Sequence, residues 1–200
     1  MNKNSKTIAM ILGLALSAAM PLAAWAQGTT PVTTPGVYAG VGAGQSEAWD
    51  YQCDALPVCK KKGSAYKFFG GWQFSRYFGV EFAYTDFGKA SSSSPGFDET
   101  VKVRAGDVTL LAQWPMLERL ALFGKVGGYY AATSVERTQA GVNTRLNESR
   151  GNLTYGGGLQ WYLTQGLAVR GEGQHYVKVG GGTIGDSDYS VYSIGLLYKF

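Results

Sequence analysis

The C-terminal stretch from Tyr189 to Phe200 constrains the fold more than any other part of the sequence. Every second side chain along it is aromatic or aliphatic, namely Tyr192, Ile194, Leu196, Tyr198 and Phe200. The opposite face is small, mixed and charged. A period of two is that of a β-strand, and a strand of this length, at ~3.3 Å per residue and tilted by about 40°, has about the height of the apolar band of a membrane. Because a membrane barrel has to seal its last strand against its first, the stretch predicts the closing strand of such a barrel.

The N-terminal segment predicts export. Lys3 and Lys6 form a basic start, residues 8–20 are apolar, and residues 24–26 read Ala-Trp-Ala, a small-x-small cleavage pattern. We therefore expect residues 1–26 to be a signal peptide and residues 27–200 to form the mature barrel. A retained membrane helix is the alternative reading of the apolar segment. No later run approaches the ~18 to 20 apolar residues of a spanning helix, so any crossing after export has to use strands.

Seven further segments alternate in the same way, and polar stretches separate them. We expect strands over residues 36–45, 65–74, 78–87, 101–114, 120–131, 150–162, 167–176 and 189–200. Long polar stretches, expected to be loops, cover residues 46–64, 88–99, 132–149 and 177–188. Between them the connections are short. This rhythm predicts an all-β fold, an eight-stranded antiparallel up-and-down transmembrane β-barrel with four long extracellular loops and short periplasmic turns.

A soluble eight-stranded barrel would alternate too, but its aromatic face would point inwards. The aromatic faces here are too bulky for so narrow an interior, which eight strands fill with packed side chains. The chain has 29 glycines and 13 tyrosines, which suit a crowded interior and aromatic belts. Its net charge of +4, which falls to +2 without the two leader lysines, is too weak and dispersed to predict binding to nucleic acid.

Four ionisable residues lie mid-strand on the face opposite the aromatic side chains: Glu81, Lys125, Arg170 and Glu172. A Lys or Arg facing lipid near the midplane would cost ~2 to 4 kcal/mol, so we expect all four to face the lumen. Counted from the short turns, Glu81 and Arg170 share one height, and Lys125 and Glu172 the next. They predict ion pairs across the lumen in a neutral polar core. A proton or ion path is the alternative.

The remaining candidate sites are few. Cys53 and Cys59 follow the predicted export signal, so we expect a disulfide that closes a small loop. Two thiols without a nearby histidine do not predict a metal site, and we expect no cofactor. The one histidine, His175, is predicted to be structural, although a Ser-His-acid arrangement in space stays open. Residues 180–185 match Gly-x-Gly-x-x-Gly in a loop, without the strand and helix of a nucleotide site.

Three segments resemble strands of the OmpA-type eight-stranded outer-membrane barrel family: residues 77–88, 168–174 and 193–200. The resemblance covers nearly the whole mature chain. It implies a lumenal network at Glu81, Lys125, Arg170 and Glu172, and a terminal strand, with its aromatic and aliphatic face ending in Phe200, that the assembly machinery reads. Two charged positions of the family pattern hold Leu111 and Gln160 here. Since that pair is proposed to exchange partners when the pore of OmpA opens, the resemblance does not predict gated conduction.

Larger members of the family continue into a periplasmic domain that grips peptidoglycan, and the resemblance here covers a barrel domain only. We expect a monomer in the bacterial outer membrane, in contact with its lipids and lipopolysaccharide. The predicted function is non-enzymatic: a barrel that anchors surface-exposed loops, with an envelope-structural role or an adhesive one towards a host or another surface. A small narrow-pore channel of the porin type and a lipid-directed hydrolase are the alternatives.

Overall fold

The computed structural model describes residues 34–49, 58–60, 62–94, 97–139, 142–180 and 186–200. Within these ranges the chain forms nine β-strands. They are β1 (Gly36–Ala48), β2 (Val58–Lys60), β3 (Lys62–Gln73), β4 (Phe78–Ser94), β5 (Phe97–Pro115), β6 (Leu120–Gln139), β7 (Val142–Tyr162), β8 (Leu167–Gly180) and β9 (Asp186–Lys199). No helix among the described residues is long and apolar enough to cross a membrane.

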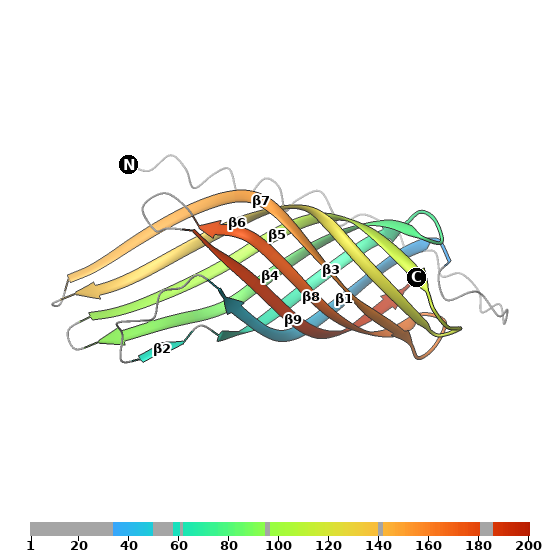
Figure 1. The fold of residues 1–200 in the computed structure, drawn as a ribbon, viewed down its shortest axis with the longest axis horizontal. Helices are drawn as coiled ribbons and strands as arrows, with labels where there is room; N and C mark the ends of the chain where they lie inside the picture. Colours follow the sequence, from blue (N-terminus) through green and yellow to red (C-terminus); the bar gives the residue numbers. More distant parts are fainter. Residues whose placement is uncertain (1–33, 50–57, 61, 95–96, 140–141, 181–185) are drawn as a thin grey trace.

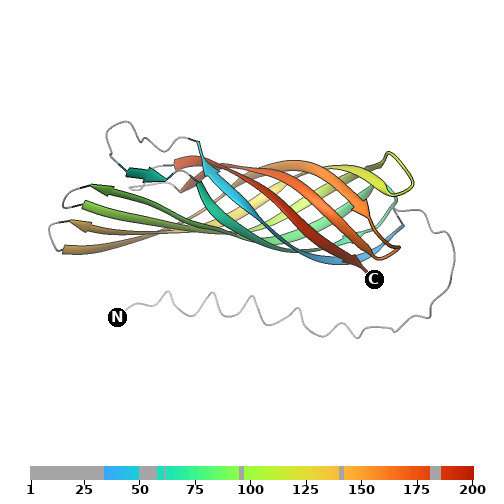
Figure 2. The same ribbon diagram turned by 90° about the horizontal axis from the view of Figure 1, so that it is seen from below.

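Eight of the described strands close into a barrel with antiparallel neighbours throughout (Figures 1 and 2). The order around the ring is β4, β3, β1, β9, β8, β7, β6 and β5, which pairs with β4 again. The seam joins β1 to β9, where Tyr38 lies opposite Lys199 and Gly42 opposite Gly195. A Cβ on Gly195 would lie only 2.4 Å from the Val41 carbonyl oxygen, so glycine permits the close approach of the two strands. The predicted eight-stranded antiparallel barrel is confirmed.

Most strands are longer than the sequence predicts. β4 and β5 pair as far as Ser94 and Phe97, and β6 and β7 as far as Gln139 and Val142. The prediction of loops over residues 88–99 and 132–149 is therefore wrong, because the described parts of these stretches are strands of two hairpins. The expected loops at 46–64 and 177–188 also contain strand, since β1 runs to Ala48 and β9 begins at Asp186.

The two long hairpins rise beyond the other strands at the end of the barrel remote from the C-terminus (Figure 1). We call residues 89–94, 97–103, 133–139 and 142–153 the protruding sheet. The short β2 pairs with the outer part of β4, so it covers one edge of this sheet. At the other edge, the described pairing of β7 with β8 starts only at Thr154, opposite Tyr176. From Val142 to Leu153, β7 pairs with β6 alone within the described ladders.

Two β-bulges mark the level at which the ring gives way to the protruding sheet. Between Asp86 and Lys89, β4 advances three residues against two of β5. Gly88 adopts a φ of 75° here, where a Cβ would lie 2.3 Å from the Ser64 carbonyl oxygen. The second bulge lies between Tyr176 and Val179 of β8, and Lys178 within it has a φ of 53°. Because bulges bend a strand, the second one accompanies the separation of β8 from β7.

Candidate functional site

The four predicted inward charges form one cluster at mid-lumen. Arg170 bridges both acids, with Nη1 2.5 Å from Glu81 Oε2 and Nη2 2.7 Å from Glu172 Oε2. Lys125 Nζ also reaches both, at 3.1 Å from Glu81 Oε1 and 2.5 Å from Glu172 Oε1. The residues therefore do not form two separate layers of pairs, as their heights suggested. At most 7% of any of the four is exposed, so water does not fill the lumen at this level.

Two further charged residues belong to the middle of the lumen, and the sequence analysis did not single them out. Lys67 Nζ lies 2.5 Å from Glu172 Oε1 and donates a hydrogen bond to Gln174 Oε1 at 2.6 Å. Asp107 Oδ2 accepts a hydrogen bond from the Tyr176 hydroxyl at 2.9 Å. With these two, three bases face three acids in the middle of the lumen. Lys199, a fourth buried base, lies apart from them and donates a hydrogen bond to Gln73 Oε1 at 3.1 Å. The alternation could have found Lys67 and Asp107, because each lies opposite the apolar face of its strand.

Aromatic rings hold the central arginine. The Arg170 guanidinium lies 4.0 Å from the centroid of the Phe123 ring and 4.7 Å from that of Phe69. Tyr38 donates its hydroxyl to Glu81 Oε2 at 2.9 Å. Such a cation between two rings retains little freedom, and the planar guanidinium suits both the rings and the carboxylates. These rings fill the lumen at the level of the charged cluster.

Leu111 and Gln160, the two positions without the family's charge, both face the lumen and are buried. Gln160 Oε1 accepts a hydrogen bond from the Tyr162 hydroxyl at 3.3 Å. Leu111 therefore supplies apolar packing and Gln160 a neutral hydrogen bond. An ion pair that exchanges partners would need charged side chains at these two positions.

Above the charged cluster, aromatic side chains fill the barrel. The Phe87 ring lies edge-on to Tyr176 and Tyr189, with centroids 4.9 and 5.5 Å apart, and Tyr129 lies 5.3 Å from Tyr176. The Tyr129 hydroxyl donates to the Val177 carbonyl oxygen at 2.6 Å. Small and β-branched residues complete this apolar layer; they are Ala48, Ala65, Val101, Val103, Ala105, Ala131, Val135, Val179 and Val191. It fills the lumen on the side of the protruding sheet.

The two faces of the long strands exchange character along their length. In the lower part of β5, Leu110 is 62% exposed on the outer face and Thr109 is buried in the lumen. Nearer the protruding sheet, Val103 is 3% exposed and lies inside, while Arg104 lies outside. β6 repeats the exchange, with an apolar outer face up to Tyr130 and a polar one from Ser134. We call this exchange the inversion of the wall.

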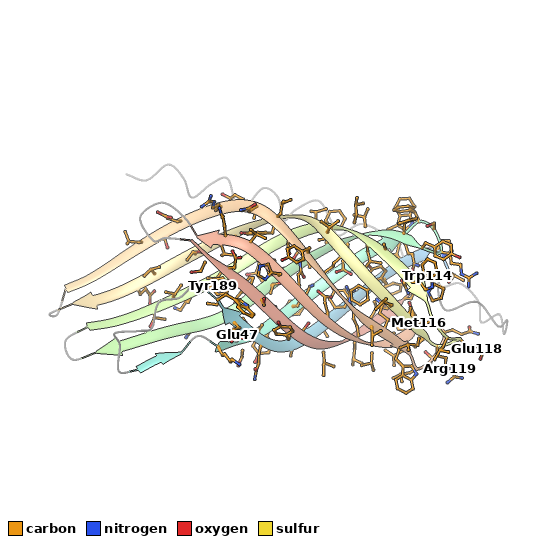
Figure 3. The ribbon with its side chains drawn as sticks, viewed as in Figure 1. Glu47, Trp114, Met116, Glu118, Arg119 and Tyr189 are labelled. Carbon is orange, nitrogen blue, oxygen red and sulfur yellow. The ribbon has the colours of Figure 1, made fainter. Side chains whose placement is uncertain are left out.

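Ion pairs lie on the outer face of the barrel at the level of the inversion of the wall. Arg104 Nε lies 3.1 Å from Asp86 Oδ2, and Lys102 Nζ lies 3.8 Å from Glu136 Oε2. On the neighbouring strands β3 and β1, Lys62 Nζ lies 3.7 Å from Glu47 Oε1, and Glu47 marks this level in Figure 3. These side chains are partly exposed, unlike those of the lumenal cluster. These ion pairs mark the level at which the outer face changes from apolar to polar.

His175 contacts a serine and an acid, but these contacts form a structural hydrogen-bond network that joins neighbouring strands. Its Nδ1 lies 2.9 Å from Ser190 Oγ and its Nε2 3.3 Å from Asp188 Oδ2. Ser190 is 6% exposed, and its Oγ accepts a hydrogen bond from Trp49 Nε1 at 3.0 Å. Asp188 also accepts the backbone N–H of Lys178 in the bulge. A buried serine whose oxygen already accepts a hydrogen bond is poorly placed as a nucleophile, whereas the contacts join β8, β9 and Trp49, the residue that follows β1.

Some predicted sites lie outside the described residues. The signal peptide (1–26) and Cys53 are among them, and the side chain of Cys59 in β2 is not described, so the disulfide stays a prediction. The glycine pattern of residues 180–185 is described only at Gly180. The outer face of β9 is described throughout, and its predicted members are exposed, from Leu196 at 51% to Ile194 at 71%.

Comparison with known proteins decides the family. The sequence model of the family described as "OmpA-like transmembrane domain" matches residues 33–200. The chain belongs to this family. Outer membrane protein A of Klebsiella pneumoniae is 26% identical over 136 residues, which are 66% of this chain and 40% of that protein. The protein of Salmonella typhi is 25% identical over 135 residues, with 66% and 39% covered. The chain thus spans about two fifths of the length of these relatives.

Solved structures share the fold of this OmpA-like barrel. The attachment invasion locus protein of Yersinia pestis superimposes with a TM-score of 0.58 at 17% identity, over 84% of this chain and all of that one. Neisserial surface protein A gives 0.57 at 13% identity, over 82% and 97%. The chain is accordingly an outer-membrane barrel, and the predicted localisation is confirmed. The apolar outer face corresponds to the lipid-facing wall of such barrels, and from the polar outer face beyond it we place the inversion at the outer surface of the membrane.

Proposed function

We propose that the protein is a non-enzymatic surface-interaction protein, in which a closed barrel anchors the protruding sheet outside the membrane. The observation that carries this proposal is the asymmetry of the outer rim. Two hairpins continue past the ring, and in the described ladders β7 pairs with β6 alone along Val142 to Asn147, so this edge of the sheet has no second strand among the described residues. An open edge offers rows of backbone N–H and C=O groups to an extended segment of another protein.

The experiment compares two shortened hairpins displayed on a non-adherent bacterial host. In one variant an Asn-Gly turn replaces residues 135–146, between the paired Ser134 and Asn147. In its matched control the same turn replaces residues 90–101, between the paired Lys89 and Lys102. Adhesion to an epithelial cell layer is measured at equal surface amounts. We expect the first variant to lose most adhesion and the second to retain more, because β2 already covers the edge of the β4–β5 hairpin.

Unchanged adhesion of both variants would contradict a role for the protruding sheet. Equal loss of adhesion in both variants would contradict the edge of β7 as the specific contact. The contact surface would then be another part of the protruding sheet. Immobilised heparin is a second, chemically defined probe, because the Yersinia pestis neighbour forms a complex with the heparin analogue sucrose octasulfate. The basic residues Lys102 and Arg104 on the outer face of β5 would make such a contact by exchanging Glu136 and Asp86 for sulfate groups.

The lumenal cluster supports anchoring over conduction. Glu81 and Arg170 are 0% and 2% exposed in the middle of the barrel, and the aromatic layer lies above them. We expect planar-bilayer recordings of the purified protein to show no discrete conductance steps. Steps that disappear when the protein is omitted would favour the channel alternative.

The closing strand supports a second proposed contact, with the outer-membrane assembly machinery. Phe200 is 66% exposed, its ring lies 5.1 Å from that of Tyr198, and its N–H donates to the Val37 carbonyl oxygen. Deletion of Phe200 should reduce insertion in cells more than refolding of the purified chain into detergent. Phe74→Ala, at another exposed ring of the same barrel end, is the control. Normal insertion of the truncated chain would contradict this assignment.

A further inference from the structure

An apolar hollow lies on the lipid-facing wall near the short turns. Its volume is about 750 Å³, within the range of about 300 to 1,000 Å³ that small-molecule sites occupy. Its lining comes from β4 to β7 and the turn before β4. The lining residues are Tyr77, Phe78, Ala112, Trp114, Leu122 and Gly124, with the backbone of neighbouring inward residues and of Gly157. Apart from backbone, its surface is almost wholly hydrocarbon and aromatic.

Small side chains in register across three strands create the hollow. Ala112 lies opposite Gly124, and Gly124 lies opposite Gly157. The next outward row towards the turns is large, with Trp114 opposite Leu122. The next row in the other direction is large as well; it contains Leu110, Val126 and Tyr155. The hollow is therefore a trough across the strands, bounded on both sides by bulky side chains.

The end of the trough carries aromatic rings and a cation. Tyr77 and Trp114 lie with ring centroids 6.1 Å apart, and the Arg76 guanidinium lies 5.8 Å from the Tyr77 ring. Figure 3 shows Trp114 at the barrel end that also bears the turn with Glu118 and Arg119. Short turns face the periplasm in bacterial barrels, and aromatic belts lie at the level of the lipid headgroups. Arg76 is thus placed where the phosphates of the periplasmic leaflet lie.

We propose that the trough binds one acyl chain of a periplasmic-leaflet phospholipid, with its phosphate at Arg76. Three observations favour this occupant. The trough opens onto the lipid-facing wall, its lining offers an alkyl chain only apolar contacts, and the cation at its rim complements a phosphodiester. Arginine binds phosphate by paired N–H donors. The bound lipid would be a fixed component of the barrel surface on the β4 to β7 side, below the protruding sheet.

Glycines on one strand provide a matched pair of variants. A Cβ on Gly124 would meet only the Gly156 carbonyl oxygen, at 3.9 Å, so a larger side chain fits and fills the trough. A Cβ on Gly128 would meet only the Asn152 carbonyl oxygen, also at 3.9 Å, on the same face but outside the trough. Gly124→Leu should therefore block the site, and Gly128→Leu should not. Ala112→Leu fills the trough from β5 and serves if Gly124→Leu fails to fold.

The test counts bound lipid on the full mature chain. The folded protein in a non-ionic detergent is titrated with dioleoyl-phosphatidylglycerol, and complexes are counted by native mass spectrometry. Folding of each variant is checked by its altered gel mobility without boiling. We expect one tightly bound lipid on the parent protein. Gly124→Leu should weaken its binding about tenfold, which corresponds to the lost burial of roughly two methylene groups. Gly128→Leu should leave the binding unchanged. Arg76→Gln should weaken the same binding event.

Several results would overturn the proposal. One is equal lipid binding by Gly124→Leu and the parent, and another is equal loss in both glycine variants. Loss of a protein dimer in Gly124→Leu, without a change in bound lipid, would assign the trough to a second copy of the chain. Unchanged binding by Arg76→Gln would remove the phosphate contact on which the choice of phospholipid rests.

Discussion

The spanning wall and the protruding sheet are built from the same four strands, yet their faces are chemically opposite. In the wall, β5 directs Val108 and Leu110 outwards and Asp107 inwards. Near the protruding sheet it directs Arg104 outwards and Val103 inwards. The backbone pairing with β6 is continuous across this change. What changes is the surrounding solvent, because lipid demands an apolar exterior and water permits a polar one over an apolar core.

The difference shows how each region can tolerate charge. In the middle of the lumen, charges are out of reach of water, and each of the six in this cluster except Asp107 has an ionic partner among the described residues. On the outer face at the inversion, charges form partly exposed pairs. Removing one partner in the lumen leaves a buried charge with poorer compensation, whereas water replaces a missing partner outside.

The largest expected effect tests these two kinds of ion pair against each other. Arg170→Ala should lower the free energy of unfolding by about 3 to 5 kcal/mol, because Glu81 and Glu172 both lose a partner in the dry lumen. Arg104→Ala, which removes the exposed partner of Asp86, should cost about 0 to 1 kcal/mol. Urea unfolding in phospholipid vesicles measures both. Similar losses would mean that the lumen screens its charges as water does.

A second pair places a new charge on one strand at two heights. Val126→Arg puts a cation on the lipid-facing wall at the middle of β6, and it should cost about 2 to 4 kcal/mol. Ser134→Arg, on the same face of β6 but above the inversion, should change stability by less than about 0.5 kcal/mol. The same unfolding measurement applies. Equal costs at the two positions would contradict the level assigned to the membrane surface.

The smallest expected effect concerns the contact between the aromatic layer and the charged cluster. Tyr176→Phe removes the hydroxyl that donates to Asp107 and contacts Thr85, and no described group bonds the other Asp107 oxygen. It should cost about 1 to 3 kcal/mol, the penalty for a buried polar group without a partner. Tyr130→Phe, at a hydroxyl on the outer face, is the control and should be nearly neutral. A neutral Tyr176→Phe would indicate that Asp107 is satisfied in another way.

The sequence predicts the spanning barrel well because one physical rule governs it throughout. Lipid outside fixes the apolar parity, so Glu81, Lys125, Arg170 and Glu172 are assigned inwards by the cost of exposing them. The same rule applies to Lys67, which sits on the inward face of β3. The ion pairs themselves depend on how far side chains reach across the lumen, and strand heights alone do not supply that distance.

The sequence analysis does not predict most of the protruding sheet, because it follows the apolar outer face that defines the wall. The predicted strands end at residue 87 on β4 and at residue 131 on β6, just before polar side chains such as Ser134 and Glu136 take over the outer face. The bulge at Gly88 shifts the register at nearly the same point. Val135 is buried and alternates with Ser134 and Glu136, so a search for period two of either parity would have extended the strand of β6.

Spin labels placed one at a time along the outer face of β6 test the inversion of the wall most directly. The positions are Leu122, Gly124, Val126, Gly128, Tyr130, Ala132, Ser134 and Glu136. In vesicles, labels up to Tyr130 should be relaxed by oxygen, which partitions into lipid, and shielded from a water-soluble nickel complex. From Ser134 on the preference should reverse. A lipid signature that continues through Glu136, or a water signature already at Val126, would contradict the account.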